Sequence, residues 1–350
     1  MVPTMNIQHR IIAATLLLLL AACTDGRSPL VVQEASNLPN TGPLLQVANV
    51  QFGGQNTAVN QMQVAYGSLF LTGTPFVFAR WDITASPESP HQTFAASDNV
   101  SAFSPDPPFG GWIVSEFGAG AMGIFGNFAL TSGSFGASVI QVGPSVQTAQ
   151  EVARYPMLGA NGDQAADVSF EFKAAVPIPS SPYIYGFTEQ DGVYLLNASN
   201  PANISRIPLN LPNSVILPYS NNGPVCCATG AALLGNKIFL GMRSQLWVIT
   251  VSQATATNGV PFTLGRVASL PGAMASLNPV GVFATNRYVY IHHELIPGSN
   301  GARPGIYVFD QNFNQVNFFP IQPLSFAVSP DDVHVYSNED DLSVKIYRLQ

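Results

Sequence analysis

Short apolar stretches alternate with turn residues along most of the chain, and this pattern predicts an all-β protein. One set of stretches ends at a small polar residue followed by a turn, and its members are 78–83, 192–197, 246–250 and 306–310. A second set precedes the first, and its members are 68–71, 183–186, 237–240 and 288–291. Apolar runs of this length between turn signals are typical of buried β-strands.

The two sets together form a unit of strand, turn, strand and turn that recurs along the chain. The polar residues that end three of the strands, Asn197, Thr250 and Asp310, are 53 and 60 residues apart. Allowing for loops, this spacing agrees with the roughly 40–50 residues of a four-stranded propeller blade. The sequence therefore predicts a β-propeller of six or seven four-stranded blades over residues 44–350. A pair of β-sandwiches is the alternative architecture.

The pattern assigns six blades, at 67–95, 103–142, 168–209, 231–270, 280–321 and 326–349. The last of them is short by one or two outer strands, and we expect residues 45–50 to supply one from the N-terminal side. Such a pairing would close the ring and remove an exposed sheet edge. Residues 118–137 are rich in Gly, Phe and Ala and fit the pattern poorly, so we expect an odd blade or a long insertion there.

The N-terminus has a short basic start and an apolar run that ends at a cysteine. His9 and Arg10 precede the almost wholly apolar residues 11–20. This run is shorter than the roughly 20 residues of a membrane-spanning helix, and it is typical of a signal-peptide core. Leu20-Ala21-Ala22-Cys23 then resembles the lipobox of bacterial lipoproteins. The resemblance implies cleavage before Cys23, lipid that includes palmitate on this cysteine, and attachment to a membrane.

The chain therefore divides into a lipoprotein signal peptide (1–22), a lipidated cysteine with a flexible tether (23–43) and the β domain (44–350). The tether contains Pro, Asn, Ser and Gly without periodicity. Thr24 follows the lipidated cysteine, where lipoproteins of the inner membrane tend to carry aspartate. The resemblance thus favours the outer membrane of a bacterial cell envelope.

The amino-acid composition argues against nucleic-acid binding and against a disordered chain. Charged residues make up 9% of the chain, the net charge is −7, and the 13 Lys and Arg residues form no cluster. Nucleic-acid binding needs a basic surface that neutralises phosphates, so this composition argues against it. The apolar fraction of 47% excludes a disordered chain.

Two further cysteines, Cys226 and Cys227, are adjacent. One interpretation is a vicinal disulfide that stiffens a loop, since disulfides persist outside the cytosol. The other is a pair of separate thiols, and the sequence leaves both open. The adjacent pair lacks the C-x-x-C spacing of zinc sites.

The most suggestive metal-binding cluster is His292-His293-Glu294. On a strand, His292 and Glu294 would share one side while His293 faces the other, so the first two are candidate metal ligands. The alternative is a strand end with solvated polar side chains. Acidic residues that could bind calcium in a central channel are Glu116, Glu171, Glu189 and Asp191. The acidic run 339–341 is expected to be a solvated hairpin turn, and no nucleophile elbow or phosphate-binding loop occurs.

Two segments resemble known repeats. Residues 192–203 (GVYLLNASNPAN) resemble LVIVD-type repeats, and residues 328–336 (VSPDDVHVY) resemble YVTN and WD-type repeats, with Asp332 where those usually carry glycine. The resemblance implies a propeller but no particular function. With no catalytic constellation and no indicated cofactor, we expect a lipid-anchored module that binds or scaffolds envelope proteins. The alternative is a metal-dependent, lactonase-like hydrolase that uses calcium in the central channel.

Overall fold

A computed structural model describes the part of the chain that forms strands and their short turns. The described residues are 44–51, 58–74, 77–95, 121–133, 136–143, 150–156, 172–188, 193–207, 228–242, 245–251, 262–266, 277–295, 303–339 and 343–349. They form six antiparallel sheets of four strands each and contain no helix. The all-β class predicted from the apolar pattern is therefore confirmed.

Five of the sheets use four consecutive strands. The first has β2 (Ala58–Ala65), β3 (Ser68–Thr74), β4 (Val77–Asp82) and β5 (His91–Ala95). The second has β6 (Ala121–Phe125), β7 (Phe128–Gly133), β8 (Gly136–Gln141) and β9 (Gln150–Pro156). The third has β10 (Phe172–Pro177), β11 (Tyr183–Thr188), β12 (Val193–Asn197) and β13 (Ser205–Ile207).

The fourth and fifth sheets repeat this plan. The fourth has β14 (Ala228–Leu234), β15 (Lys237–Met242), β16 (Gln245–Val251) and β17 (Phe262–Arg266). The fifth has β18 (Leu277–Ala284), β19 (Val289–Leu295), β20 (Gly305–Phe309) and β21 (Gln315–Phe319). In every case the strand order in space follows the order along the chain, so each sheet is a meander.

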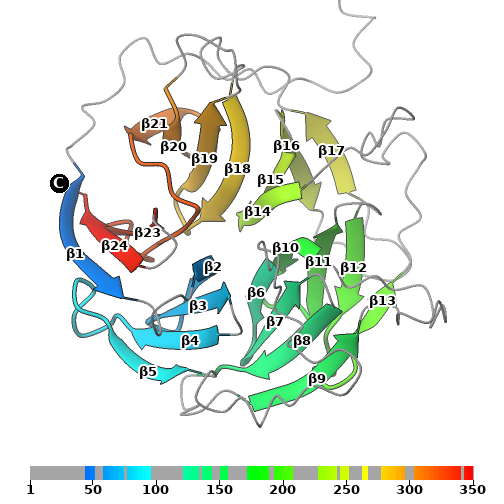
Figure 1. The fold of residues 1–350 in the computed structure, drawn as a ribbon. Helices are drawn as coiled ribbons and strands as arrows, with labels where there is room; N and C mark the ends of the chain where they lie inside the picture. The colour runs from blue at the N-terminus through cyan, green and yellow to red at the C-terminus, as the bar shows by residue number, and fades with distance from the viewer. Residues whose placement is uncertain are drawn as a thin grey trace, which may run out of the picture.

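The sixth sheet combines the two ends of the domain. It contains β22 (Ser325–Val328), β23 (His334–Asn338), β24 (Ser343–Arg348) and, as its outer strand, β1 (Leu45–Gln51). β1 pairs antiparallel with β24, with Leu45 opposite Arg348 and Gln51 opposite Ser343. Figure 1 shows the C-terminus beside the start of β1. The prediction that residues 45–50 complete the last sheet is confirmed.

The six sheets surround a common centre (Figure 1). The first strand of each sheet lies innermost, and the contacts between neighbouring sheets run from β2 to β6, β10, β14, β18, β22 and back to β2. Inner strands thus meet around the centre, while the second and third strands of each sheet are covered on both sides. This arrangement is the propeller type that the repeat spacing predicted.

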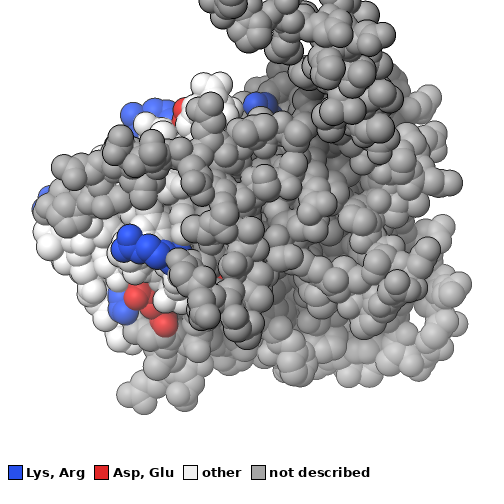
Figure 2. Space-filling view, turned by 90° about the horizontal axis from the view of Figure 1, so that it is seen from above, with Lys and Arg blue, Asp and Glu red and all other residues white. Residues whose placement is uncertain are grey.

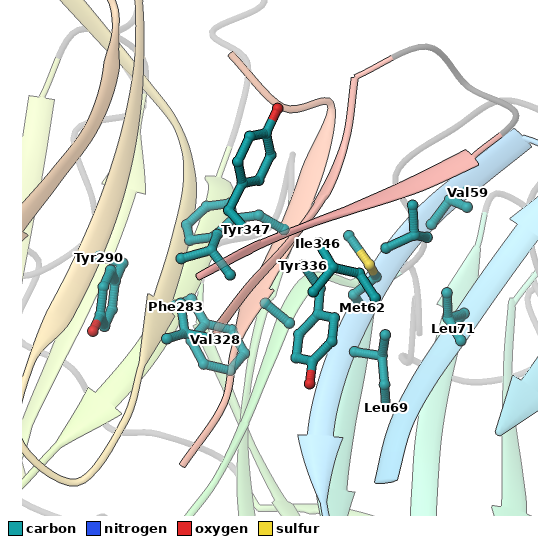
Figure 3. Packing of buried hydrophobic residues seen from close by; sticks show 14 of the residues in the cluster. Val59, Met62, Leu69, Leu71, Phe283, Tyr290, Val328, Tyr336, Ile346 and Tyr347 are labelled. Carbon is teal, nitrogen blue, oxygen red and sulfur yellow. The ribbon is translucent and has the colours of Figure 1, made fainter. Parts of the chain in front are cut away.

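The main hydrophobic core lies where the first, fifth and sixth sheets pack together (Figure 3). Leu69 and Leu71 of β3 are fully buried, as are Tyr336 of β23 and Ile346 of β24. Burying a side chain of this size contributes about 1.5–3 kcal/mol to stability. The continuous apolar runs of the sequence are explained by this burial, because both faces of each sheet contact a neighbouring sheet.

One hydrogen bond recurs in five of the sheets and explains the repeat pattern. The last residue of the third strand, or the residue directly after it, donates its backbone N–H to the turn between the first two strands. The five bonds are Ile83 to Gly67 (3.0 Å), Val142 to Asn127 (2.8 Å), Ala198 to Pro182 (2.7 Å), Val251 to Asn236 (2.8 Å) and Leu349 to Val333 (2.8 Å). The residue just before this N–H donor is often polar and caps the turn that follows. Asn197 is an example, because its Oδ1 accepts a hydrogen bond from Ser199 N–H at 3.0 Å.

Four of the predicted blades, 168–209, 231–270, 280–321 and 326–349, agree with the observed sheets to within four residues, whereas the first omits β2 and the second is wrong. The second sheet covers 121–156 rather than 103–142, and the poorly fitting segment 118–137 contains the regular hairpin of β6 and β7. Glycine in β6 has a packing reason, because a Cβ on Gly123 would lie 2.8 Å from the carbonyl oxygen of Ala175. The strand predicted at 112–115 lies outside the described residues.

Candidate binding surface

The antiparallel meanders give the ring two different faces. The turns after the first and third strands of every sheet lie on one face, which we call the turn face. The turns after the second strands and the connections between sheets lie on the opposite face, the connection face. Leu45 is on the turn face, because it pairs with Arg348 at the end of the third strand of the sixth sheet.

A cavity of about 170 Å³ lies at the turn-face end of the central channel. Its lining comes from the last residues of five inner strands, at 63–65, 123–124, 175–177, 231–233 and 282–284. The lining side chains are apolar except for Gln63, and none of them is acidic, basic or a thiol. A cavity of about 150 Å³ holds a benzene molecule, whereas small-molecule sites are usually about 300–1,000 Å³. The cavity therefore has the size of one side chain, and more polar than apolar surface is exposed in it, because backbone groups of the strand ends line it as well.

Tyr66 lies at this end of the channel, directly after the cavity-lining Ala65. Its φ is 51° and that of Gly67 is 66°, so both residues of the tight turn are left-handed, as in a type I′ hairpin. The equivalent turns of the second and fourth sheets place Gly126 and Gly235 at this position. A residue with a Cβ pays about 1–2 kcal/mol for this conformation.

The Tyr66 side chain nevertheless remains 40% exposed. Partial burial raises the pKa of its phenol, so the phenol stays protonated at neutral pH. The sequence therefore keeps an exposed aromatic residue at a strained position directly after the cavity-lining Ala65. Such strain is characteristic of functional sites, because stability alone would favour glycine there.

Basic side chains near the turn face bridge four of the junctions between sheets. Arg80 of the first sheet donates to the carbonyl oxygen of Gly143 in the second at 3.2 Å. Lys237 of the fourth sheet reaches the carbonyl oxygen of Gln311 in the fifth at 3.4 Å. The fifth and sixth sheets and the sixth and first sheets are joined by arginine–carboxylate pairs. Four of the 13 Lys and Arg residues in the chain are used in this way.

The bridge between the fifth and sixth sheets centres on Asp332. Its Oδ2 accepts from Arg287 Nε at 2.7 Å and its Oδ1 accepts from the Tyr290 hydroxyl at 2.8 Å. Burial, followed by the nearby Asp332 carboxylate, raises the pKa of Tyr290, so this phenol remains a donor. Asp332 has a φ of 62°, a left-handed conformation that favours glycine. In this chain the carboxylate joins two sheets instead.

The junction of the sixth and first sheets has a looser bridge. Glu88 Oε1 lies 3.1 Å from Arg348 Nη1 and 3.5 Å from His334 Nε2. The turn before His334 is held by Asp331, whose pKa is lowered: burial opposes ionisation, but hydrogen bonds from Ser329 and from the Val333 N–H outweigh it. In Figure 2, the charged atoms on the described surface form small groups of both signs rather than one patch.

The candidate metal ligands of β19 have unequal environments. His292 is 2% exposed and His293 is fully buried, whereas Glu294 is exposed. The alternative of solvated side chains is therefore wrong for both histidines. Burial lowers the pKa of His292 to about 4 and that of His293 to about 3, the latter also through the nearby His292. The His293 ring meets Tyr307 edge-on, with centroids 5.3 Å apart.

The described residues contain no group of three or more His, Cys, Asp or Glu side chains that could hold a metal ion. Metal binding by His292 and Glu294 stays a prediction. Cys23, the pair Cys226 and Cys227, and the acidic candidates lie outside the described residues; these acidic candidates are Glu116, Glu171, Glu189 and Asp191. The calcium-dependent hydrolase alternative is therefore also untested.

The expectation for the acidic run 339–341 is wrong for its first member. Glu339 is half-buried and accepts hydrogen bonds from Ser337 at 3.0 Å and from the Tyr347 hydroxyl at 2.6 Å. Lys345 Nζ lies 3.1 Å from its other carboxylate oxygen. Residues 340 and 341 lie outside the described part of the chain.

Comparison with known proteins supports the fold alone. No family model matches the chain, and no curated protein matches it either. Among solved structures, the chain is similar to the β-propeller domain of Cps50 (Swd1) from Myceliophteria thermophila, with a TM-score of 0.53 and 10% identity. The match covers 88% of this chain and 100% of that one. The likeness indicates a β-propeller. Within the described ranges, no helix has the length and apolar character needed to cross a membrane.

Proposed function

We propose that the protein is a lipid-anchored, six-bladed β-propeller of the bacterial cell envelope that binds a protein partner on its turn face. The six four-stranded sheets and the pairing of β1 with β24 support a closed ring. The basic start, apolar core and box ending in Cys23 support the lipid anchor and an outer-membrane location. Metabolic labelling with palmitate tests the anchor, since Cys23→Ala is expected to abolish incorporation.

Tyr66 is the observation that carries the binding role. Tyr66 is 40% exposed and directly follows Ala65 in the lining of a cavity the size of one side chain, and an exposed aromatic residue at such a place suits contact with a partner. The Tyr66 ring supplies an aromatic contact from this protein, and the cavity accepts one side chain from the partner. The strained backbone at position 66 is explained if the aromatic ring has been retained for contact rather than for stability.

The bridges between sheets suit this role because they fix the turn face before a partner arrives. Arg287, Asp332 and Tyr290 hold the turns of the fifth and sixth sheets in one relative position. A surface that is already ordered loses little conformational entropy on binding. The proposed scaffold is therefore a pre-formed face rather than a segment that folds on its partner.

Site-specific photo-crosslinking in intact cells tests the proposal. A benzophenone amino acid replaces Tyr66 in one strain and Leu324 in a control strain. Leu324 is 58% exposed and apolar, but it lies on the connection face before β22. We expect a discrete crosslinked protein from position 66 and not from position 324. Equal crosslinking from both positions, or none from position 66, would contradict the proposed binding face.

A further inference from the structure

β1 forms the outer edge of the sixth sheet and lies on the rim of the ring (Figure 1). Among the strands that the structure describes, it pairs with β24 alone. The bond from Leu349 N–H to the Val333 carbonyl oxygen (2.8 Å) continues the ladder between β23 and β24. Alternate residues of an antiparallel strand bond to opposite neighbours, so Val344, Ile346 and Arg348 direct their backbone groups towards β1.

Three residues of β1 direct their backbone N–H and C=O groups away from β24. They are Gln46, Asn49 and Gln51, because their partners on β24 face β23 instead. All three side chains are exposed as well. A row of such backbone groups is a template for pairing with another β-strand.

β1 lacks the features by which the other outermost strands avoid such pairing. β9 is also seven residues long, but it contains Glu151, Arg154 and Pro156. β5, β13, β17 and β21 have only three to five residues. β1 (LQVANVQ) has seven residues, no charge and no proline, and its first residue, Leu45, is 44% exposed. Short length, charges and proline protect sheet edges, so β1 is the least protected of the six outer strands.

A bulge gives β1 one apolar and one polar face. The register with β24 shifts between Gln46 and Ala48. Leu45 therefore lies on the same face as Ala48 and Val50, because these three residues pair with alternate residues of β24. Gln46 and Asn49 lie on the other face. A strand added at this edge must continue an apolar face and an uncharged amide face.

We propose that this edge binds β1 of a second copy of the chain, so that two rings join edge to edge in a symmetric dimer. Antiparallel pairing about a twofold axis between Val47 and Ala48 places Leu45 opposite Val50 of the second copy. The same register places Gln46 opposite Asn49, and both residues have outward backbone groups to exchange. Apolar side chains thus meet apolar ones, amides meet amides, and no like charges meet across the axis. The inference is independent of the proposed binding face and lipid anchor.

Photo-crosslinking of the purified full chain tests the dimer. A benzophenone amino acid replaces Gln46 or, as a matched control, Gln150. Both are exposed glutamines at or next to the start of a seven-residue outer strand. Unlabelled and heavy-isotope-labelled protein are mixed before irradiation, so that mass spectrometry distinguishes links between copies from links within one chain.

We expect a dimer linked from position 46 to β1 of the other copy, and none from position 150. Its yield should rise with protein concentration, because a single strand pair is a small interface. Asn49→Pro removes one outward N–H from each copy, so association should weaken about tenfold while pairing with β24 is kept.

Asn49→Asp is the second variant, in case proline unfolds the strand. Its carboxylate lies opposite Lys345 within its own sheet, but it brings two like charges together near the twofold axis. This variant should also weaken the dimer while the melting temperature stays at the wild-type value. The inference would be overturned by an absent dimer at position 46, by equal dimer yields from both positions, or by undiminished crosslinking in a folded variant.

Discussion

The two sides of the ring hold neighbouring sheets together in different ways. Where the first, fifth and sixth sheets meet, aliphatic and aromatic side chains together form the main core, and arginine–carboxylate pairs cross the junctions. Where the second and third sheets meet, Gly123 allows the backbone of β6 to approach Ala175 closely. The same propeller therefore joins some neighbouring sheets through polar side chains and others through close backbone contact. The first kind of junction is weakened by removing a polar group, and the second by adding a side chain.

The largest effect is expected where backbones touch. Gly123→Val would place its Cβ 2.8 Å from the Ala175 carbonyl oxygen, which cannot move without displacing β10. We expect a loss of about 3 kcal/mol in the free energy of unfolding, measured by urea denaturation. Gly126→Asn is the matched control, because nothing lies within 4 Å of its Cβ and asparagine tolerates the φ of 48°. A loss below 1 kcal/mol for Gly123→Val would contradict the close-packing account.

Breaking the polar bridge should cost less. Asp332→Gly keeps the left-handed turn but removes the carboxylate that accepts from Tyr290 and Arg287. We expect a loss of about 2 kcal/mol, since the buried Tyr290 hydroxyl would lose its acceptor. Asp332→Asn retains an acceptor oxygen and should lose roughly half as much. If both variants were as stable as the wild type, the bridge would not hold these sheets together.

The buried histidines predict a pH dependence on the aromatic side of the ring. Their folded-state pKa values, about 4 for His292 and about 3 for His293, lie below the unfolded value near 6.5. The unfolded chain therefore binds more protons as pH falls below 6.5, and stability declines towards pH 4. Each histidine contributes at most about 1.4 kcal/mol per pH unit to this slope.

His293→Phe should lower this slope and leave stability at pH 7.5 within about 1 kcal/mol, because the ring contact with Tyr307 is conserved. Urea denaturation at pH 7.5 and at pH 5 provides the measurement. An unchanged slope in His293→Phe would show that this histidine already titrates normally in the folded protein.

The smallest change in stability is expected at Tyr66. Tyr66→Asn relieves the left-handed strain but removes a partly buried ring, so the free energy of unfolding should change by less than about 1 kcal/mol. Crosslinking between the partner and a probe at Asn236, on the turn face of the fourth sheet, should nevertheless be lost. A variant that is unchanged in both stability and crosslinking would remove Tyr66 from the binding surface.

The second and third strands of each sheet, and the strand that completes the last sheet, could be predicted from the sequence. The second and third strands are covered on both faces, so they are continuous apolar runs. The strand at 45–50 was found for another reason: the last blade lacked an outer strand, and β1 is itself exposed or only partly buried. Inner strands such as β2 (AVNQMQVA) and β6 (AMGIF) mix glycine, polar and apolar residues, because one edge faces the channel and small residues allow close approach. Their pattern has neither a strand nor a turn signature.

The candidate binding site could not be found from the sequence, because it depends on five inner strands that meet only in the folded ring. The one local signal was Tyr66-Gly67 between two apolar stretches, which marks a tight turn but does not reveal a left-handed tyrosine. The histidine pair was found, yet its burial was not, because burial depends on the neighbouring sheets.

The most direct test of the central claim is photo-crosslinking from position 66 in a variant whose cavity has been filled. Ala232→Phe adds a ring to the cavity lining, and Val282→Phe provides a second such variant if the first unfolds. We expect the partner to crosslink to position 66 when the cavity is open. This crosslinked product should disappear in a filled variant that keeps the wild-type melting temperature. Undiminished crosslinking in a folded, filled variant would show that no partner side chain enters the cavity.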